Sequence, residues 1–312
     1  MSLSVGIVGL PNCGKSTLFN ALLKRQIAQV AEYPYTTIEP NVGVVEVPDD
    51  RLKAIVRIIA EEKNKTLMGV DLKIVPAAIK FIDIAGLIKG AHQGEGLGNQ
   101  FLAHIREVDA ILHVVRAFTN PNVTHVHGKI NPKEDIEVVD LELELGEIKK
   151  PTIYVLNVDE RSITSTTGTK GITGLEQDAV VIPICAKLEA ELSELPEDEQ
   201  KAYLKEVGIE QSGLDQVILA SYKLLNLITF FTIAGGKMVQ AWPIKEGSTM
   251  IEVAEKVHTD FAKGFITAEV IRWDKLIEVD TWHVAKEKGL IHLAGRDEEV
   301  NDGDVIEFKF RV

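Results

Sequence analysis

The first two thirds of the chain alternate nearly continuous apolar runs with amphipathic stretches. β-branched apolar runs fall at 3–10, 77–86, 110–118, 152–157 and 179–186. Such unbroken runs are typical of parallel strands that are covered on both faces. Apolar residues at helical spacing lie between and after these runs, at 15–25, 51–62, 97–108, 135–150 and 213–227. The alternation predicts a doubly wound α/β sheet.

The pattern changes near residue 229. Short strands are predicted at 228–235, 238–244, 264–271 and 304–312, with one amphipathic helix at 249–264. This predicts a small α+β domain over 229–312, which follows the doubly wound domain over 1–228. The polar, Thr/Gly-rich segment 161–174 is expected to be a mobile loop.

Composition narrows the class of protein. The chain has 312 residues, 45% of them hydrophobic, and a net charge of −13. The acidic balance also holds after residue 229, so charge gives no support for nucleic acid, although it does not exclude a local basic face. Two cysteines are too few for a disulfide framework or a zinc cluster. Without a membrane-length apolar run or a signal-peptide pattern, a soluble, cytoplasmic monomer that avoids membranes is expected.

The strongest motif is "GLPNCGKS", Gly9 to Ser16, which matches G-x-x-x-x-G-K-[ST] between a predicted strand and a predicted helix. In such a phosphate loop Lys15 reaches the β- and γ-phosphate oxygens and the Ser16 hydroxyl binds Mg²⁺. The alternative, a chance glycine turn with a helix-capping serine, does not explain the strand–loop–helix context. The predicted nucleotide-binding residues of this loop are Asn12, Cys13, Gly14, Lys15, Ser16 and Thr17.

Two further segments follow in the order expected of a nucleotide switch. "FIDIAGL" supplies Asp83 for the magnesium shell, and the Gly86 N–H can sense the γ-phosphate. "YPYTTIEPN" supplies Thr37, whose hydroxyl can complete the magnesium shell. Taken alone, Asp83 could be a simple helix cap and Thr37 part of a turn. Three motifs in this order favour the switch.

Several segments resemble one family. "GLPNCGKSTLFNALL", "YPYTTIEPNVGVV", "FIDIAGLIKGAHQGEGLGNQFLAHIREVDAILHVVRAF" and "THVHGKINP" are similar to the Obg-related YchF proteins, the Obg-like ATPases. "WPIKEGSTMIEVAEKVHTDFAKGFITAEVI" and "VNDGDVIEFKF" resemble the family's TGS domain, which is ubiquitin-like (β-grasp). The resemblance spans nearly the whole chain and implies a P-loop ATPase that meets the ribosome or RNA. It also implies that a helical arm is missing near 146–151.

The base-binding motif departs from that of guanine-specific proteins. Where these carry Asn-Lys-x-Asp, this chain reads "NVDE", so Val158 replaces the lysine and Glu160 the aspartate. The longer acid misplaces a bidentate acceptor, which can remove about 1–3 kcal/mol of discrimination. The family resemblance implies Asn-x-x-Glu and ATP, which Asn157 and Glu160 match. We therefore predict ATP over GTP. Further predicted base neighbours are Phe118, Val158, Cys185 and Ala186.

Catalysis must proceed without the usual glutamine, because Leu87 stands where many GTPases orient water. The resemblance implies that His125 takes this role beside Lys15 and Gly86, whereas a lone loop histidine is more often a solvated surface residue. Two alternatives stay open: a GTPase, and a slow or non-hydrolysing module in which nucleotide gates contact with the ribosome or RNA.

Overall fold

The structure, a computed structural model, describes residues 3–25, 41–66, 72–84, 97–126, 128–163, 174–175, 178–234 and 238–311, without the side chains of 62–66 and 97–100. The chain divides into two compact units. One comprises Met1–Glu46 with Ile79–Leu225, and the other Val47–Ala78 with Asn226–Val312. The sequence predicted a boundary near 228 but assigned Val47–Ala78 to the first domain. The structure places that segment in the second unit, because its strand joins the second sheet.

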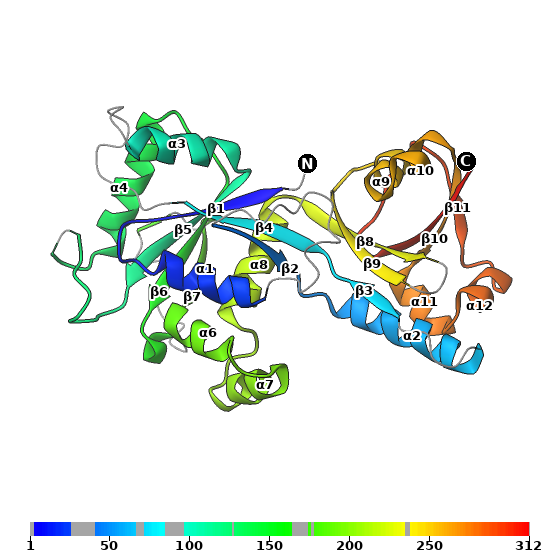
Figure 1. Ribbon diagram of the computed structural model, residues 1–312, viewed down its shortest axis with the longest axis horizontal. Helices are drawn as coiled ribbons and strands as arrows, with labels where there is room; N and C mark the ends of the chain where they lie inside the picture. Colours follow the sequence, from blue (N-terminus) through cyan, green and yellow to red (C-terminus); the bar gives the residue numbers. More distant parts are fainter. Residues whose placement is uncertain are drawn as a thin grey trace. The chain divides into compact units, whose positions relative to one another are not determined.

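The first unit is built on a six-stranded sheet of order β2-β4-β1-β5-β6-β7 (Figure 1). The pairs β1–β4, β1–β5, β5–β6 and β6–β7 are parallel, as the apolar runs predicted. The order reverses at β1, and ligands of such sheets bind at the carboxyl ends of the strands beside that point. The strands are β1 (Ser4–Val8), β2 (Val42–Glu46), β4 (Ala78–Asp83), β5 (Ala110–Ala117), β6 (Thr152–Val158) and β7 (Val180–Ile184).

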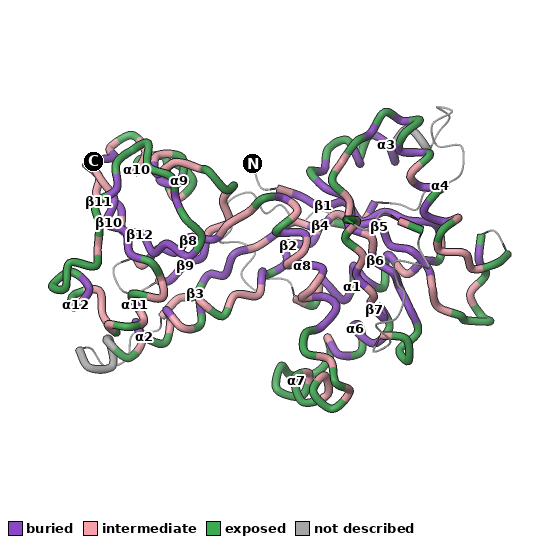
Figure 2. Tube along the Cα trace, turned by 180° about the vertical axis from the view of Figure 1, so that it is seen from behind, coloured by how far each residue is buried: buried purple, intermediate pink, exposed green. Residues whose placement is uncertain are grey.

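Helices cover both faces of this sheet, which explains why β1, β5 and β6 are buried along most of their length (Figure 2). α3 and α4 pack on one face, while α1, α6 and α8 pack on the other. The helices are α1 (Lys15–Lys24), α3 (Leu97–Glu107), α4 (Pro132–Leu145), α6 (Ala186–Leu192), α7 (Glu197–Glu206) and α8 (Gly213–Leu224), with a 3₁₀ turn η3 (Glu160–Ser162).

Helix α4 is shorter at its end than the predicted 135–150. The Asn131 side chain caps its start by accepting from the Glu134 N–H. At its end Glu147 adopts a left-handed φ of 55°, and the Ile148 N–H donates to the Leu143 carbonyl. This closure satisfies the last carbonyls and turns Ile148 back onto the core. A short loop then leads directly into β6.

The second unit holds a mixed sheet of order β11-β10-β12-β8-β9-β3. α9 and α10 pack on one face around an apolar cluster that includes Phe230, Met250 and Phe308. α2 and α11 pack against each other and contact β9 and β10. The elements are α2 (Asp50–Thr66), β3 (Lys73–Val75), β8 (Leu227–Ala234), β9 (Met238–Lys245), α9 (Met250–Val257), α10 (Thr259–Lys263), β10 (Phe265–Arg272), α11 (Trp273–Val279), α12 (Trp282–Glu287), β11 (His292–Ala294) and β12 (Asp304–Phe310).

The single helix predicted at 249–264 is wrong in one respect. His258 is extended, with φ −163° and ψ 138°, and its ring nitrogen accepts from the Asp260 N–H, so one helix ends there and another begins. The predicted strands of the second unit are confirmed, and the TGS assignment stays an expectation. Among the helices that the structure describes, none is both long and apolar enough to cross a membrane.

Candidate functional site

The phosphate loop connects β1 to α1 and depends on two glycines. Gly9 has φ 152°, and a Cβ there would lie 2.3 Å from the Val114 carbonyl oxygen. Gly14 has φ 104°, and a Cβ there would lie 2.2 Å from the Asn157 side-chain nitrogen. Neither position can hold a larger residue without moving backbone or the base motif. The glycines of the motif are thus required by this geometry.

Lys15 lies over this loop with its ammonium held by the loop itself. Nζ donates to the Gly9 carbonyl at 3.0 Å and to the Leu10 carbonyl at 2.9 Å. The side chain is buried, so its charge acts in a medium less polar than water. A cation at the amino-terminal end of α1 adds to the helix dipole in attracting anions. The arrangement is that of a phosphate-binding site.

Asp83 ends β4 beside the start of α1. Its Oδ1 atom is buried and has no hydrogen-bond partner among the residues that the structure describes. Burial raises the pKa of this carboxyl, while the charge of Lys15 and a hydrogen bond from the Ser16 side chain lower it. A carboxylate oxygen lacking a partner next to an exposed hydroxyl suits a hard cation such as Mg²⁺. The other predicted switch residues, Thr37 and Gly86, lie outside the described residues, as does Leu87.

Asn157 ties the phosphate loop to the base-binding side. Its Nδ2 donates to the Cys13 carbonyl at 2.9 Å, and its Oδ1 accepts from the Ala186 N–H at 3.0 Å. Asn157 is buried, so both bonds are shielded from water. The alternative that Asn157 merely ends its strand with a turn does not fit two long-range bonds. Asn157 therefore sets the spacing between β6, the phosphate loop and the start of α6.

The two cysteines act as small apolar residues. Both Cys13 and Cys185 are buried and free. Burial is the largest cause of the raised pKa of each thiol, so both remain protonated near neutral pH. A protonated thiol is a poor nucleophile. Their predicted contacts with nucleotide are therefore limited to the backbone at these positions, and stay predictions.

The rest of the base motif divides between core and surface. Val158 is only 6% exposed and packs in a cluster with Val115, Ile136 and Leu156, so its side chain belongs to the core. Its predicted contact with adenine stays a prediction. Glu160 instead is exposed, and its Oε1 accepts a hydrogen bond from the Tyr203 hydroxyl at 3.1 Å.

Phe118 lies just beyond β5, where its ring is stacked under a buried guanidinium. The Arg116 Cζ lies 4.5 Å from the ring centroid. The Arg116 side chain also donates to the carbonyls of Phe118, Val123 and Thr124. Asp159 accepts from the Thr119 N–H at 3.2 Å and so fastens this loop to the base motif. Phe118 is therefore placed by backbone contacts at both sides.

His125 is not the solvated surface residue that its loop position favoured. Its side chain is 6% exposed, and its Nε2 lies 2.9 Å from Oδ2 of Asp135 in the first turns of α4. The preceding Thr124 carbonyl accepts from Asn12 Nδ2 at 3.1 Å, which brings this loop against the phosphate loop. The ring is thus oriented by a buried carboxylate next to the phosphate site. Its catalytic role stays a prediction.

Sequence reasoning missed four residues that organise the site: Arg116, Asp135, Asp159 and Tyr203. Arg116 carried a signal, since an arginine within an apolar strand must find partners for its charge. Asp159 lies inside the motif. Asp135 and Tyr203 carried no local signal, because each acts on a residue in another element.

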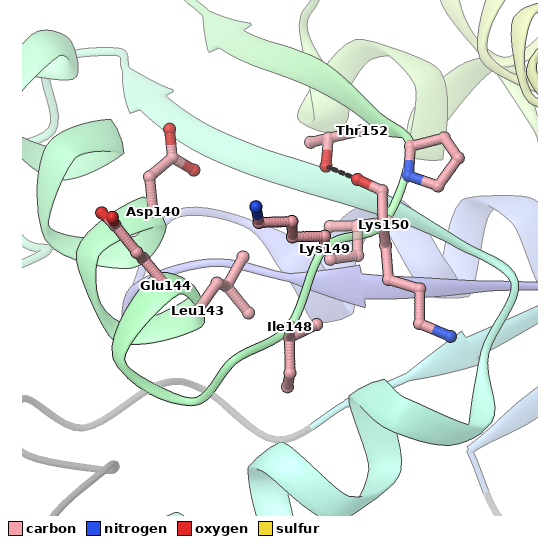
Figure 3. A pocket seen from close by; sticks show the side chains of 9 residues that line it. Asp140, Leu143, Glu144, Ile148, Lys149, Lys150 and Thr152 are labelled. Carbon is pink, nitrogen blue, oxygen red and sulfur yellow. Dashed lines mark hydrogen bonds between the residues drawn. The ribbon is translucent and has the colours of Figure 1, made fainter.

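A surface pocket of about 510 Å³ lies elsewhere (Figure 3). It is lined by the end of α4, the loop 146–151 and the first residues of β5 and β6, and Lys149 extends in it towards Asp140 and Glu144. These are the amino-terminal ends of parallel strands, whereas the phosphate loop follows the carboxyl end of β1. The pocket is therefore not part of the nucleotide site.

Comparison with known proteins gives consistent family matches. Residues 4–158 match the family model described as "50S ribosome-binding GTPase". Residues 227–311 match the YchF-GTPase C-terminal model, described as "Protein of unknown function (DUF933)". The chain is 40% identical to "Ribosome-binding ATPase YchF" of Bacillus subtilis and 41% identical to the protein of that name from Haemophilus ducreyi, with complete coverage of both chains in each case.

The structural match extends over the same length. The YchF GTPase of Schizosaccharomyces pombe is 28% identical, with a TM-score of 0.81 over 99% of this chain and 98% of that one. The alignment to the Bacillus subtilis protein spans 378 positions against 312 residues here, which leaves about 66 positions without a counterpart. The sequence predicted that a helical arm of the family is missing near 146–151. That the positions without a counterpart belong to this arm stays a prediction.

Proposed function

The chain belongs to the YchF family, and we propose that it is an Mg²⁺-dependent ATPase that acts as a ribosome-associated molecular switch and prefers ATP to GTP. The names of its relatives do not agree on the nucleotide, since some are called ATPases and others GTPases. The base preference must therefore be argued from this chain. The supporting observation is the geometry around Asn157 and Glu160.

The asparagine half of the base motif is used internally. With Nδ2 on the Cys13 carbonyl and Oδ1 on the Ala186 N–H, Asn157 shapes the site. Base readout then falls to Glu160, the exposed acid of the motif. A glutamate carries its carboxylate one methylene further out than the aspartate of a guanine-specific site. An acceptor pair displaced by this distance fits the two adjacent donors of guanine poorly, which supports adenine.

The residues at the phosphate end fit a magnesium ion. Ser16 and Asp83 would hold it, because Asp83 offers a buried oxygen that has no partner within the described ranges and Ser16 an exposed hydroxyl. When bound with nucleotide, Mg²⁺ neutralises charge that develops on the phosphate oxygens. Lys15 adds a positive charge at the same place and orients the phosphates through its fixed ammonium.

His125 is the group proposed to orient the attacking water. Asp135 fixes the ring, and a fixed imidazole loses little freedom when it engages a water molecule. Gly86, whose N–H is proposed to sense the γ-phosphate, and Thr37, proposed as a metal ligand, complete the scheme.

The experiment is phosphate release by the full chain with ATP or GTP, in Mg²⁺ and in EDTA, together with competition binding of the two nucleotides. We expect ATP to bind more tightly, and release to require Mg²⁺ and to fall at least tenfold in His125→Ala. His104→Ala is a control on α3. Clear GTP preference would establish the GTPase alternative. Turnover unchanged in His125→Ala would remove this residue from the mechanism.

Ribosome association is tested by co-sedimentation with ribosomes in ATP, ADP or no nucleotide. A switch is expected to bind in one nucleotide state more than in the other by at least several-fold. Equal binding in all three conditions would contradict the switch. Nucleotide-dependent binding without measurable phosphate release would support the non-hydrolysing module instead.

A further inference from the structure

Glu160, the proposed base-reading acid, has one of its two oxygens already engaged. The Tyr203 hydroxyl donates to Oε1 at 3.1 Å from a position 43 residues further along the chain. In the described part of the chain no ion pair involves Glu160. Among the described residues, the Tyr203 hydroxyl is the group whose hydrogen bond orients this carboxylate.

Tyr203 belongs to α7 and is positioned by apolar contacts on one side of that helix. The helix buries none of its residues completely (Figure 2). Tyr203 and Leu204 nevertheless pack against a small apolar cluster formed by Cys185, Leu188 and Leu192. Ile163, just beyond Glu160, joins the same cluster. One patch thus connects the loop that backs the base, the turn that carries Glu160 and the helix that carries Tyr203.

The number of acceptor oxygens bears on which purine fits. Guanine presents two adjacent donors, the N1–H and the exocyclic amine, and a carboxylate binds both only when both of its oxygens face the base. Adenine presents a single donor group on that edge, its exocyclic amine. A carboxylate that turns Oε1 towards a tyrosine keeps Oε2 for the base. Oε2 alone satisfies adenine, whereas guanine requires Oε1 to accept from the tyrosine and from the base at the same time.

We propose that Tyr203 is a specificity-determining residue, which engages Oε1 of Glu160 and thereby disfavours guanine. This inference rests on the proposed function, in which Glu160 reads the base. It differs from that function in assigning part of the discrimination to α7, outside the base motif. The hydrogen bond to Glu160 also raises the pKa of the Tyr203 hydroxyl, so the phenol remains a donor at neutral pH.

The test is Tyr203→Phe, which removes the hydroxyl and keeps the ring in its apolar cluster. The dissociation constants of non-hydrolysable ATP and GTP analogues are measured for the full chain with Mg²⁺. We expect the ratio of the GTP constant to the ATP constant to fall about three- to tenfold, mainly through tighter GTP binding. ATP affinity should change by no more than about twofold, because adenine uses one acceptor in either case.

The matched control is Tyr154→Phe. Tyr154 also donates its hydroxyl to a carboxylate, that of Asp140, at 3.2 Å, but on the side of β6 that faces α4. Its loss should leave the nucleotide ratio unchanged. The coupling to Glu160 is tested by repeating Tyr203→Phe in a Glu160→Ala background, where the substitution should no longer change the ratio.

The outcomes separate the two proposals. If the natural chain prefers ATP and Tyr203→Phe leaves the ratio unchanged, the role of Tyr203 is overturned while the ATPase proposal stands. Equal weakening of both nucleotides would make Tyr203 a packing residue only and would also overturn its specificity role. If the natural chain prefers GTP with Tyr203 in place, both proposals fail.

Discussion

The two ends of the nucleotide site are built by different means. At the phosphate end, eight consecutive residues adopt a backbone conformation that two glycines permit, and Lys15 is held by the carbonyls of the same loop. At the proposed base end, Asn157 of β6 bonds to the backbone of the phosphate loop and of α6, and the Tyr203 side chain of α7 bonds to Glu160 of η3. The phosphate end is thus local in sequence, and the base end is assembled from distant elements. Affinity is therefore expected to depend on the first and specificity on the second.

The largest expected effect is that of Lys15→Met at the phosphate end. Loss of a buried cation that is proposed to contact the reacting phosphate should lower the rate of phosphate release about 10²- to 10³-fold. The ratio of ATP to GTP affinity should not change, because the base end is untouched. Lys24→Met is the control, since Lys24 lies at the exposed end of the same helix and pairs with Glu194. A changed ratio in Lys15→Met would break the division between the two ends.

Asn157→Ala tests the connection between the ends. The substitution leaves the Cys13 carbonyl and the Ala186 N–H without their partner in a buried place. We expect the free energy of unfolding, from urea titration, to fall by about 3 kcal/mol. Both nucleotides should bind more weakly by a similar factor, because the spacing of the two ends changes for either base. Selective loss of one nucleotide would show that Asn157 reads the base directly.

The phosphate end was predictable from sequence because its signal is contiguous. Gly9, Gly14, Lys15 and Ser16 occur at a fixed spacing between an apolar strand and an amphipathic helix. The parallel strands were predictable for the same reason, since burial on both faces leaves an unbroken apolar run. The structure then added the physical cause, which is the close approach of Gly9 to Val114 and of Gly14 to Asn157.

The base end was only partly predictable. The substitutions in "NVDE" pointed to Glu160, but nothing near residue 203 indicates a contact with it. Helix α7 carries too few apolar residues for a clear amphipathic pattern. Strand β3 has three residues and pairs with a strand more than 160 positions away, so no local pattern assigns it to the second unit. Contacts between distant segments are the part that a single sequence does not supply.

A third prediction concerns stability in acid and a buried histidine of β5. His113 pairs in register with Val8, the last residue of β1 before the loop. Burial, with a further contribution from the charge of Lys15, lowers the pKa of His113 to about 3. The unfolded chain therefore binds a proton at this residue below pH 6.5 that the folded chain does not. The contribution of His113 to the free energy of unfolding is therefore fully present above pH 6.5 and is lost as the pH falls from 6.5 towards 3.

Because of His113, we expect the free energy of unfolding to fall by about 2 kcal/mol when the pH is lowered from 6.5 to 5. The measurement is the free energy of unfolding of the natural chain and of His113→Phe at both pH values. The variant should lose less stability on acidification, whatever its stability at neutral pH. Equal losses in the two proteins would show that His113 is protonated in the folded state.

The smallest expected effect concerns Phe118. It separates, within the proposed base end, stacking on the base from contact with its edge. Stacking on a base is tolerant of sequence, because every base presents a π-face, whereas Glu160 is proposed to contact an edge that differs between the purines. Phe118→Leu should therefore weaken ATP and GTP alike, by about two- to fivefold, from the loss of roughly 0.5–1 kcal/mol of ring contact. Competition binding measures both constants.

Because the Arg116 guanidinium is held by three carbonyls besides the ring, the loop should keep its conformation in the variant. A shift in the ATP-to-GTP ratio would place discrimination on the ring face as well as on the edge, and would reduce the share assigned to Glu160 and Tyr203.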